Sequence, residues 1–399
     1  MNPGFAALHR YPFEKLAQLL ADVSAPAGGI LDLAIGEPKH PTPAFVHEVM
    51  AAALPTTGKY PATRGTAELR GAIADWLSRR YGLAGIDPDT EVLPLTGTRE
   101  GLFSIAQCII DRSRADAAVL MPNPGYQIYE GAALLAGAEP VYLDCEPDTG
   151  YLPALGQVEE AQWRRCQLLY LCNPGNPSGA VMPMSMLTRA VELAQAFDFI
   201  VVADECYAEL YGDEAQPPAG ILAAAEAAGV PAFSRCLAMH SLSKRSNAPG
   251  LRSGFVAGDA NVMAQFLRYR TYHGCAMPLY TQQASIAAWC DEAHVVENRA
   301  RYREKFAATV AILAPALHCA TPPAGFYLWL NIGGDDQAFA RRLYGEHGVR
   351  VLPGSLLARE HAGTNPGAGH IRVALVPELS DCVRAAEAIR QTYETAFGH

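Results

Sequence analysis

Lysine is scarce in this sequence. Of its 399 residues only five are lysines, and arginine carries most of the positive charge; the lysines are Lys15, Lys39, Lys59, Lys244 and Lys305. Acidic residues (41) outnumber lysine and arginine together (31), which leaves a net charge of −10. This balance argues against nucleic acid or an anionic membrane as the main partner. With so few lysines, one that follows an apolar segment is a candidate for chemistry.

Long apolar runs and paired cysteines are missing as well. Charged residues, proline or glycine interrupt every apolar stretch before the ~20 residues that a membrane-spanning helix needs. Residues 1–20 contain His9, Arg10, Glu14 and Lys15, unlike a signal peptide. The ten cysteines include no Cys-x-x-Cys pair, a pattern typical of reduced thiols. We therefore expect a cytoplasmic protein with no disulfide framework and no metal site.

From residue 92 onward, short apolar runs alternate with segments of helical spacing. The runs are residues 92–95, 117–121, 140–143, 167–172 and 199–203. This alternation predicts an α/β fold with a mostly parallel sheet covered by helices on both faces.

The last third of the chain predicts a smaller α/β unit. Long helices are expected at 260–272 and 280–313, and shorter ones at 336–346 and 380–396. Strands are expected at 326–330, 349–352 and 370–375. We expect an N-terminal arm with part of the small domain (1–45), a large domain (46–285) and a C-terminal small domain (286–399).

Residues 241–254 combine a lysine with the residue types that bind phosphate. Lys244 follows the apolar run 236–239, and a lysine desolvated at such a strand end has a lowered pKa and can attack a carbonyl. Ser241, Ser243 and Arg252 offer hydroxyl donors and a guanidinium, a set suited to phosphate. Together they indicate a phosphorylated aldehyde such as pyridoxal phosphate, held as a Schiff base. The alternative is an ordinary solvated lysine.

Polar side chains follow several of the other apolar runs. Asp204 ends the run at 199–203, where it either faces a ligand's ring nitrogen or has a structural role as a helix cap or salt-bridge partner. Asn176 and Tyr126 lie in turns after two further runs, and ligands gather at the carboxyl ends of parallel strands. Thr98 and Arg99 lie in a turn before a helix, whose first N–H groups attract an anion.

The order and spacing of five of these residues resemble the class I/II aminotransferases of the pyridoxal-phosphate fold type I superfamily. Asn176 and Asp204 are 28 positions apart (204 − 176), Tyr207 follows after 3, and Arg252 follows Lys244 after 8. The resemblance covers nearly the whole chain. It implies the fold type I architecture, a large cofactor-binding domain plus a smaller α/β domain, with pyridoxal phosphate as the cofactor.

The resemblance also implies a role for each residue around the cofactor ring. Lys244 forms the Schiff base and later moves the substrate's α-proton. Asp204 pairs with the ring nitrogen, and Tyr207 and Asn176 bind the ring's phenolic oxygen. Tyr126 stacks on the ring. The phosphate is held by Ser241, Ser243, Arg252, Thr98 and Arg99.

Substrate binding and assembly are implied in the same way. Arg372 grips the substrate α-carboxylate, which the backbone of Gly36 and the side chain of Asn176 also approach. Tyr60 reaches the phosphate of a neighbouring subunit, so the expected homodimer shares its active sites between subunits.

Within the family, residues 35–40, 269–277 and 297–306 resemble the N-succinyldiaminopimelate aminotransferases of bacterial lysine synthesis. The implied reaction passes an amino group between N-succinyl-LL-2,6-diaminopimelate and 2-oxoglutarate. The alternatives are an aspartate- or alanine-type aminotransferase, a C–S β-lyase, and a cofactor-binding regulator without turnover.

Substrates of the implied reaction carry a remote carboxylate, which needs a further cationic or donor group. The candidates are Arg64, Arg270, Tyr272 and His273, each of which has a surface role as its alternative. Residues 10–13 are expected to line the space for the acyl chain.

Overall fold

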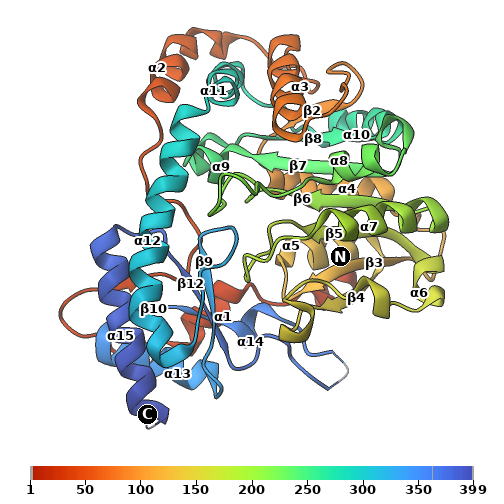
Figure 1. Ribbon diagram of the computed structural model, residues 1–399. Coiled ribbons are helices and arrows are strands. Elements are labelled where there is room, and N and C mark those ends of the chain that lie inside the picture. Colours follow the sequence, from red (N-terminus) through yellow and green to blue (C-terminus); the bar gives the residue numbers. More distant parts are fainter. Residues whose placement is uncertain (1–2, 362, 398–399) are drawn as a thin grey trace.

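A computed structural model describes residues 3–361 and 363–397 and is built around a seven-stranded sheet (Figure 1). The sheet order is β2-β8-β7-β6-β5-β3-β4. Its strands are β2 (Val92–Leu95), β3 (Ala118–Asn123), β4 (Glu139–Asp144), β5 (Cys166–Cys172), β6 (Ile200–Asp204), β7 (Cys236–Ser241) and β8 (Gly254–Gly258). β8 alone runs opposite to the other six strands of this sheet. The predicted α/β fold with a mostly parallel sheet is confirmed.

Helices cover both faces of this sheet because alternate strand residues point to opposite sides. Leu169 and Val201 face one apolar cluster, and Leu168 and Val202 face the other. The first cluster is completed by α3 (Ala67–Tyr81), α7 (Met184–Phe197), α8 (Ile221–Ala227) and α11 (Leu279–Cys290). The second is completed by α4 (Thr98–Ile109), α5 (Gln127–Ala136) and α10 (Ala260–His273).

The C-terminal part forms the smaller α/β unit. Strands β11 (Leu352–Pro353), β12 (His370–Ala374) and β9 (Tyr327–Asn331) make an antiparallel sheet in that order. The chain's N-terminal segment joins this unit: β1 (Leu31–Asp32) pairs in parallel with β10 (Val349–Arg350), and α1 (Pro12–Leu19) packs on α14 (Gly354–Leu357). Helices α13 (Asp336–His347) and α15 (Leu379–Phe397) cover the sheet. The remaining α-helices of the described residues are α2 (Ala44–Ala53), α6 (Glu160–Arg165), α9 (Leu242–Arg245) and α12 (Ala293–Leu317).

Two predicted elements were wrong in their bounds. The helix expected at 280–313 is two helices, α11 and α12 (Ala293–Leu317), because Asp291 is extended and its carboxylate accepts from the His294 N–H. Local side-chain bonds of this kind compete with helix continuation. The strand expected at 349–352 is divided between β10 and β11, which belong to different sheets. The predicted domain boundaries remain a prediction.

Helix α12 runs from the level of the central sheet to the small unit (Figure 1). Among residues 3–361 and 363–397, no helix has both the length and the apolar character needed to span a membrane.

Candidate active site

A cavity of ≈ 650 Å³ lies where β5, β6 and β7 end, and residues of the small unit form its other wall. The predicted site residues that line it are Gly36, Thr98, Arg99, Tyr126, Asn176, Asp204, Tyr207, Ser241, Ser243, Lys244, Arg252 and Arg372. Tyr60 does not line it, and its side chain is fully exposed. The fold therefore brings together, within one chain, every residue predicted to bind the cofactor or the α-carboxylate except the one expected to act across subunits.

Lys244 lies in α9, the short helix that directly follows β7. The Ser241 hydroxyl begins α9 by accepting from the Ser243 N–H at 3.0 Å, which turns the chain so that Lys244 faces the cavity. Its Nζ donates to the Gly36 carbonyl and lies 5.3 Å from the centroid of the Phe326 ring. Burial lowers the pKa of Lys244 to about 8. The amine is thus largely available as a nucleophile in mildly alkaline solution.

Asp204 is the last residue of β6 and is only 4% exposed. Its Oδ2 accepts from the Tyr129 hydroxyl at 2.8 Å and its Oδ1 from the Cys206 N–H at 3.3 Å. No basic side chain of the described residues lies within ion-pair distance, and burial raises the pKa of this carboxyl. A buried acid without a cationic partner at a cavity wall fits a protonated ring nitrogen.

Arg372 forms the opposite wall from strand β12. It is 3% exposed, donates from Nη2 to the Ala34 carbonyl at 2.8 Å and from Nη1 to Asn176 Oδ1 at 3.0 Å. Its guanidinium lies 4.3 Å from the centroid of the Tyr327 ring. The other N–H groups of a guanidinium held in this way suit a carboxylate.

Tyrosines pack tightly between the two walls. The hydroxyls of Tyr207 and Tyr327 are 3.1 Å apart, and burial raises the pKa of Tyr207. A Cβ atom on Gly36 would lie 1.8 Å from the Tyr327 hydroxyl oxygen. Glycine is therefore required at position 36 for the chain to pass this close to the wall.

The turn that begins α4 has the features of a phosphate site. Gly97 has φ +88°, and a Cβ there would lie 2.2 Å from Arg252 Nη2. Arg252 donates to the Pro249 carbonyl at 2.8 Å, and the Thr98 hydroxyl lies 3.0 Å from the Cys206 thiol. A helix N-terminus, a guanidinium and hydroxyls surround a turn whose backbone is open to approach.

The candidates for a remote carboxylate do not line the cavity. Arg64 donates to the Asp89 carbonyl, and Arg270 is buried and donates to both carboxylate oxygens of Glu100, at 2.6 and 2.7 Å. Tyr272 is 86% exposed and His273 is exposed. The binding role proposed for Arg270 is therefore not supported: its charge is already neutralised in a structural ion pair.

Glu100, His273 and Cys275 each offer one atom that could bind a metal ion, and these atoms lie within 4.8 Å of one another. The Arg270 guanidinium already occupies the Glu100 carboxylate, and its positive charge opposes a cation there.

Several residues that line or support the site were not found from the sequence. Tyr129, which holds Asp204, follows Tyr126 by three positions and so lies near the same helix face; this spacing was the available signal. Cys206 and Tyr327 carry no recognisable motif. In the N-terminal segment 10–13, expected to line the acyl space, Tyr11 and Phe13 do line the cavity.

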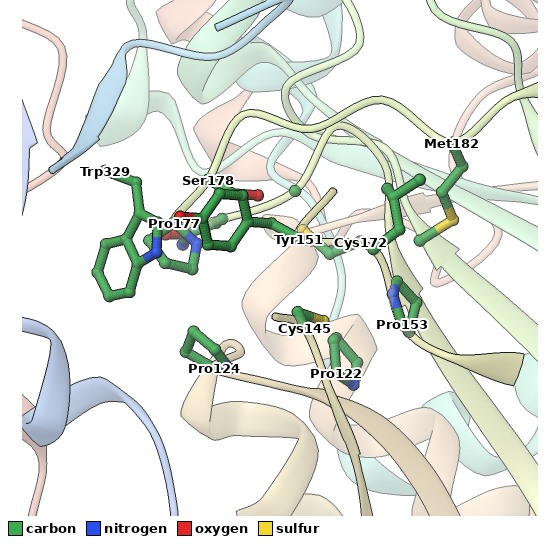
Figure 2. Close-up of a pocket in the computed structure, with 13 residues that line it drawn as sticks. Pro122, Pro124, Cys145, Tyr151, Pro153, Cys172, Pro177, Ser178, Met182 and Trp329 are labelled. Atoms are coloured by element: carbon green, nitrogen blue, oxygen red, sulfur yellow. The ribbon is translucent and has the colours of Figure 1, made fainter. Parts of the chain in front are cut away.

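A second, much smaller cavity of ≈ 20 Å³ lies against the turn that carries Asn176 (Figure 2). It shares Cys172 and Asn176 with the large cavity. Its walls include the rings of Tyr151 and Trp329 and four prolines, Pro122, Pro124, Pro153 and Pro177. Rigid rings therefore support the Asn176 turn from behind, and the space holds at most about one water molecule.

The buried lysine, the unpaired acid and the phosphate-type turn define a pyridoxal-phosphate site. The model of the family described as aminotransferase class I and II matches residues 29–389, and the chain belongs to this family. Its cofactor is pyridoxal phosphate, which supplies an aldehyde that condenses with amines and a ring that withdraws electrons.

Individual relatives match this chain over nearly its full length. An aminotransferase structure from Neisseria meningitidis is 45% identical, with a TM-score of 0.95, and covers 98% of this chain and 100% of its own. An LL-diaminopimelate aminotransferase of Desulforudis audaxviator is 31% identical over 387 residues, 95% of this chain and 94% of the relative. The structure of a probable N-succinyldiaminopimelate aminotransferase from Thermus thermophilus is 27% identical, with a TM-score of 0.84, over 96% of this chain and 100% of its own.

Proposed function

We propose that this aminotransferase passes an amino group between N-succinyl-LL-2,6-diaminopimelate and 2-oxoglutarate, as a cytoplasmic homodimer in bacterial diaminopimelate and lysine synthesis. The products are N-succinyl-2-amino-6-oxopimelate and glutamate. The observation that carries the proposal is the extent of the cavity, which continues from Lys244 to Tyr11 and Phe13 of the N-terminal segment. The name of the Thermus thermophilus relative supports the succinylated substrate.

Each wall of the cavity has a task in this reaction. Arg372 binds the substrate α-carboxylate and so orients the α-carbon toward Lys244. Lys244, with its lowered pKa, accepts the α-proton and later returns a proton during the transfer. Asp204 keeps the ring nitrogen protonated, and Ser241, Ser243 and Arg252 anchor the phosphate.

A second candidate is the transamination of LL-diaminopimelate without an acyl group. The name of the Desulforudis audaxviator relative favours it, and Glu37, an exposed carboxylate that lines the cavity, suits a distal ammonium. The two candidates differ in the far half of the substrate: one presents an amide and a third carboxylate, the other a free ammonium.

The test is a half-reaction on the purified, cofactor-loaded protein, followed by the absorbance of the bound cofactor. N-succinyl-LL-diaminopimelate, its N-acetyl analogue, free LL-diaminopimelate, glutamate, aspartate, alanine and cystathionine are added separately. We expect the succinylated donor and glutamate to convert the cofactor to its amino form fastest. Lys244→Ala is the control that excludes a reaction of free cofactor.

Other results of this experiment would each identify one of the alternative functions. Faster conversion by free LL-diaminopimelate than by its succinylated form selects the second candidate. Preference for aspartate or alanine indicates a general aminotransferase, and pyruvate released from cystathionine indicates a lyase. A folded protein that turns over none of these substrates is a regulator.

A further inference from the structure

Two arginines flank the phosphate-type turn at α4 and their side chains extend in different directions. Arg252 lies against Gly97, so its guanidinium covers the turn itself. Arg99, in the first turn of α4, instead donates from Nε to the Tyr126 hydroxyl at 2.7 Å. Both side chains are exposed and both line the cavity. The resemblance assigned them one task, but their contacts separate them.

Arg99 has unused donors at the mouth of the cavity. Within residues 3–361 and 363–397, neither Nη atom of Arg99 has a hydrogen-bond or ion-pair partner. The hydrogen bond from its Nε fixes the plane of the guanidinium group. Tyr11 and Tyr126 line the same cavity, and after burial the Tyr11 phenol further raises the pKa of Tyr126. A guanidinium bonded to one phenol, in a cavity that a second phenol also lines and without an acidic partner, is a site for a carboxylate.

Arg99 and Arg372 lie on different elements around Lys244. Both positive charges are close enough to lower the Lys244 pKa, after burial, while the negative charge of Glu37 works in the opposite direction. A substrate whose α-carboxylate is on Arg372 therefore shares its cavity with a second cation.

We propose that Arg99, with the hydroxyls of Tyr11 and Tyr126, binds the remote carboxylate of the substrate. The ligand class is an amino or keto acid with a second carboxylate: glutamate, 2-oxoglutarate and acylated diaminopimelates. This inference deepens the proposed function, since it rests on substrates that carry a remote carboxylate. It replaces phosphate binding as the main task of the Arg99 side chain.

The test measures binding of unreactive acids to the cofactor-loaded protein, through the change that they cause in cofactor absorbance. Glutarate carries two carboxylates and butyrate one. In Arg99→Gln we expect the glutarate Kd to rise about 10- to 100-fold, because a hydrogen-bonded charge is lost, and the butyrate Kd to change less than about 3-fold. Arg99→Lys should recover part of the loss.

Arg252→Gln is the matched control, since it removes the other exposed arginine of the same cavity. It should weaken cofactor binding, measured by dialysis and fluorescence, without changing the ratio of the glutarate and butyrate constants. The inference is overturned if Arg99→Gln binds glutarate like the wild type, or if it loses cofactor as Arg252→Gln does and keeps the ratio.

The outcome is independent of which diaminopimelate derivative reacts. Unreactive acids report the carboxylate site alone, whereas the donor panel on wild-type protein tests the proposed function. A glutarate effect with no turnover of the succinylated donor would reject the function and keep the site.

Discussion

Lys244 owes its reactivity to burial. A solvated lysine is almost fully protonated below pH 9, whereas the environment of Lys244 lowers its pKa to about 8. The hydrogen bond to the Gly36 carbonyl and the neighbouring Phe326 ring hold the amine at the cavity wall. At the residue scale, desolvation and position together make this amine nucleophilic.

The pH dependence of cofactor binding follows from this pKa. Because the neutral amine attacks the aldehyde, the rate at which cofactor-free protein takes up pyridoxal phosphate should rise with pH up to about 8 and then level off. Stopped-flow absorbance between pH 6.5 and 10 measures it. A rate that keeps rising to pH 10 would show that Lys244 titrates like a solvated lysine.

Gly97 is the residue on which the phosphate turn depends. Gly97→Ala forces a side chain onto φ +88° and pushes its Cβ against Arg252. We expect cofactor affinity to fall about 10-fold or more and stability to fall by about 1–3 kcal/mol. Equilibrium dialysis of the cofactor and thermal melting measure the two effects.

Gly137 offers a matched control. It also has a positive φ, +86°, but lies at the far end of α5 with open space around its Cβ position. Gly137→Ala should cost about 1 kcal/mol of stability and leave cofactor affinity unchanged. Equal losses of affinity in both variants would mean that Gly97 acts only through stability.

At the scale of elements, the two ends of the central strands have different tasks. The carboxyl ends of β5, β6 and β7 present Cys172, Asp204 and Ser241 to the cavity. The opposite edge carries connections that hold the fold. Asp259 is one of these: it follows β8 and caps α10, accepting from the N–H groups of Asn261, Val262 and Arg235.

Asp259→Ala should therefore reduce stability without changing chemistry. Removing a buried cap with three donors should cost about 2–3 kcal/mol. The exposed cap Asp335 of α13 provides the comparison, and Asp335→Ala should cost about 1 kcal/mol. The melting temperature measures the stability of each variant, and the half-reaction rate on folded protein measures its chemistry. A slower half-reaction in folded Asp259→Ala would contradict the different tasks assigned to the two ends of the central strands.

At the scale of the whole molecule, Tyr60 and Tyr272 lie outside the cavity with their rings in solvent. Such exposure suits the predicted homodimer, in which Tyr60 of one subunit completes the site of the other. The single chain already brings together Lys244, Asp204 and Arg372, so in the predicted homodimer the partner would complete the site rather than assemble it.

Mixing two inactive variants tests this arrangement. Lys244→Ala lacks the amine and Tyr60→Ala lacks the expected contact to the neighbouring phosphate. After joint refolding, each mixed dimer should hold one intact site, which restores roughly a quarter of wild-type activity for random pairing. Activity that stays at the sum of the two separate variants would place Tyr60 outside the neighbouring site.

The sequence by itself determined the mostly parallel sheet and the candidate residues at its edge. Apolar runs define buried strands; Asp204 directly follows one such run, and Lys244 comes five positions after the end of another, so local order along the chain was sufficient. The break between α11 and α12 could not be predicted because it depends on side-chain bonds around Asp291, including the contact from Arg245.

Only the tertiary structure decided which distant groups meet. The Arg372 contact with Asn176 joins residues 196 positions apart, and the Lys244 contact with Gly36 joins residues 208 apart. The direction of the Arg99 side chain depends on Tyr126, which another strand and turn bring beside it. The direction of a side chain is set by packing between elements, and this packing cannot be predicted from the spacing of residues along one element.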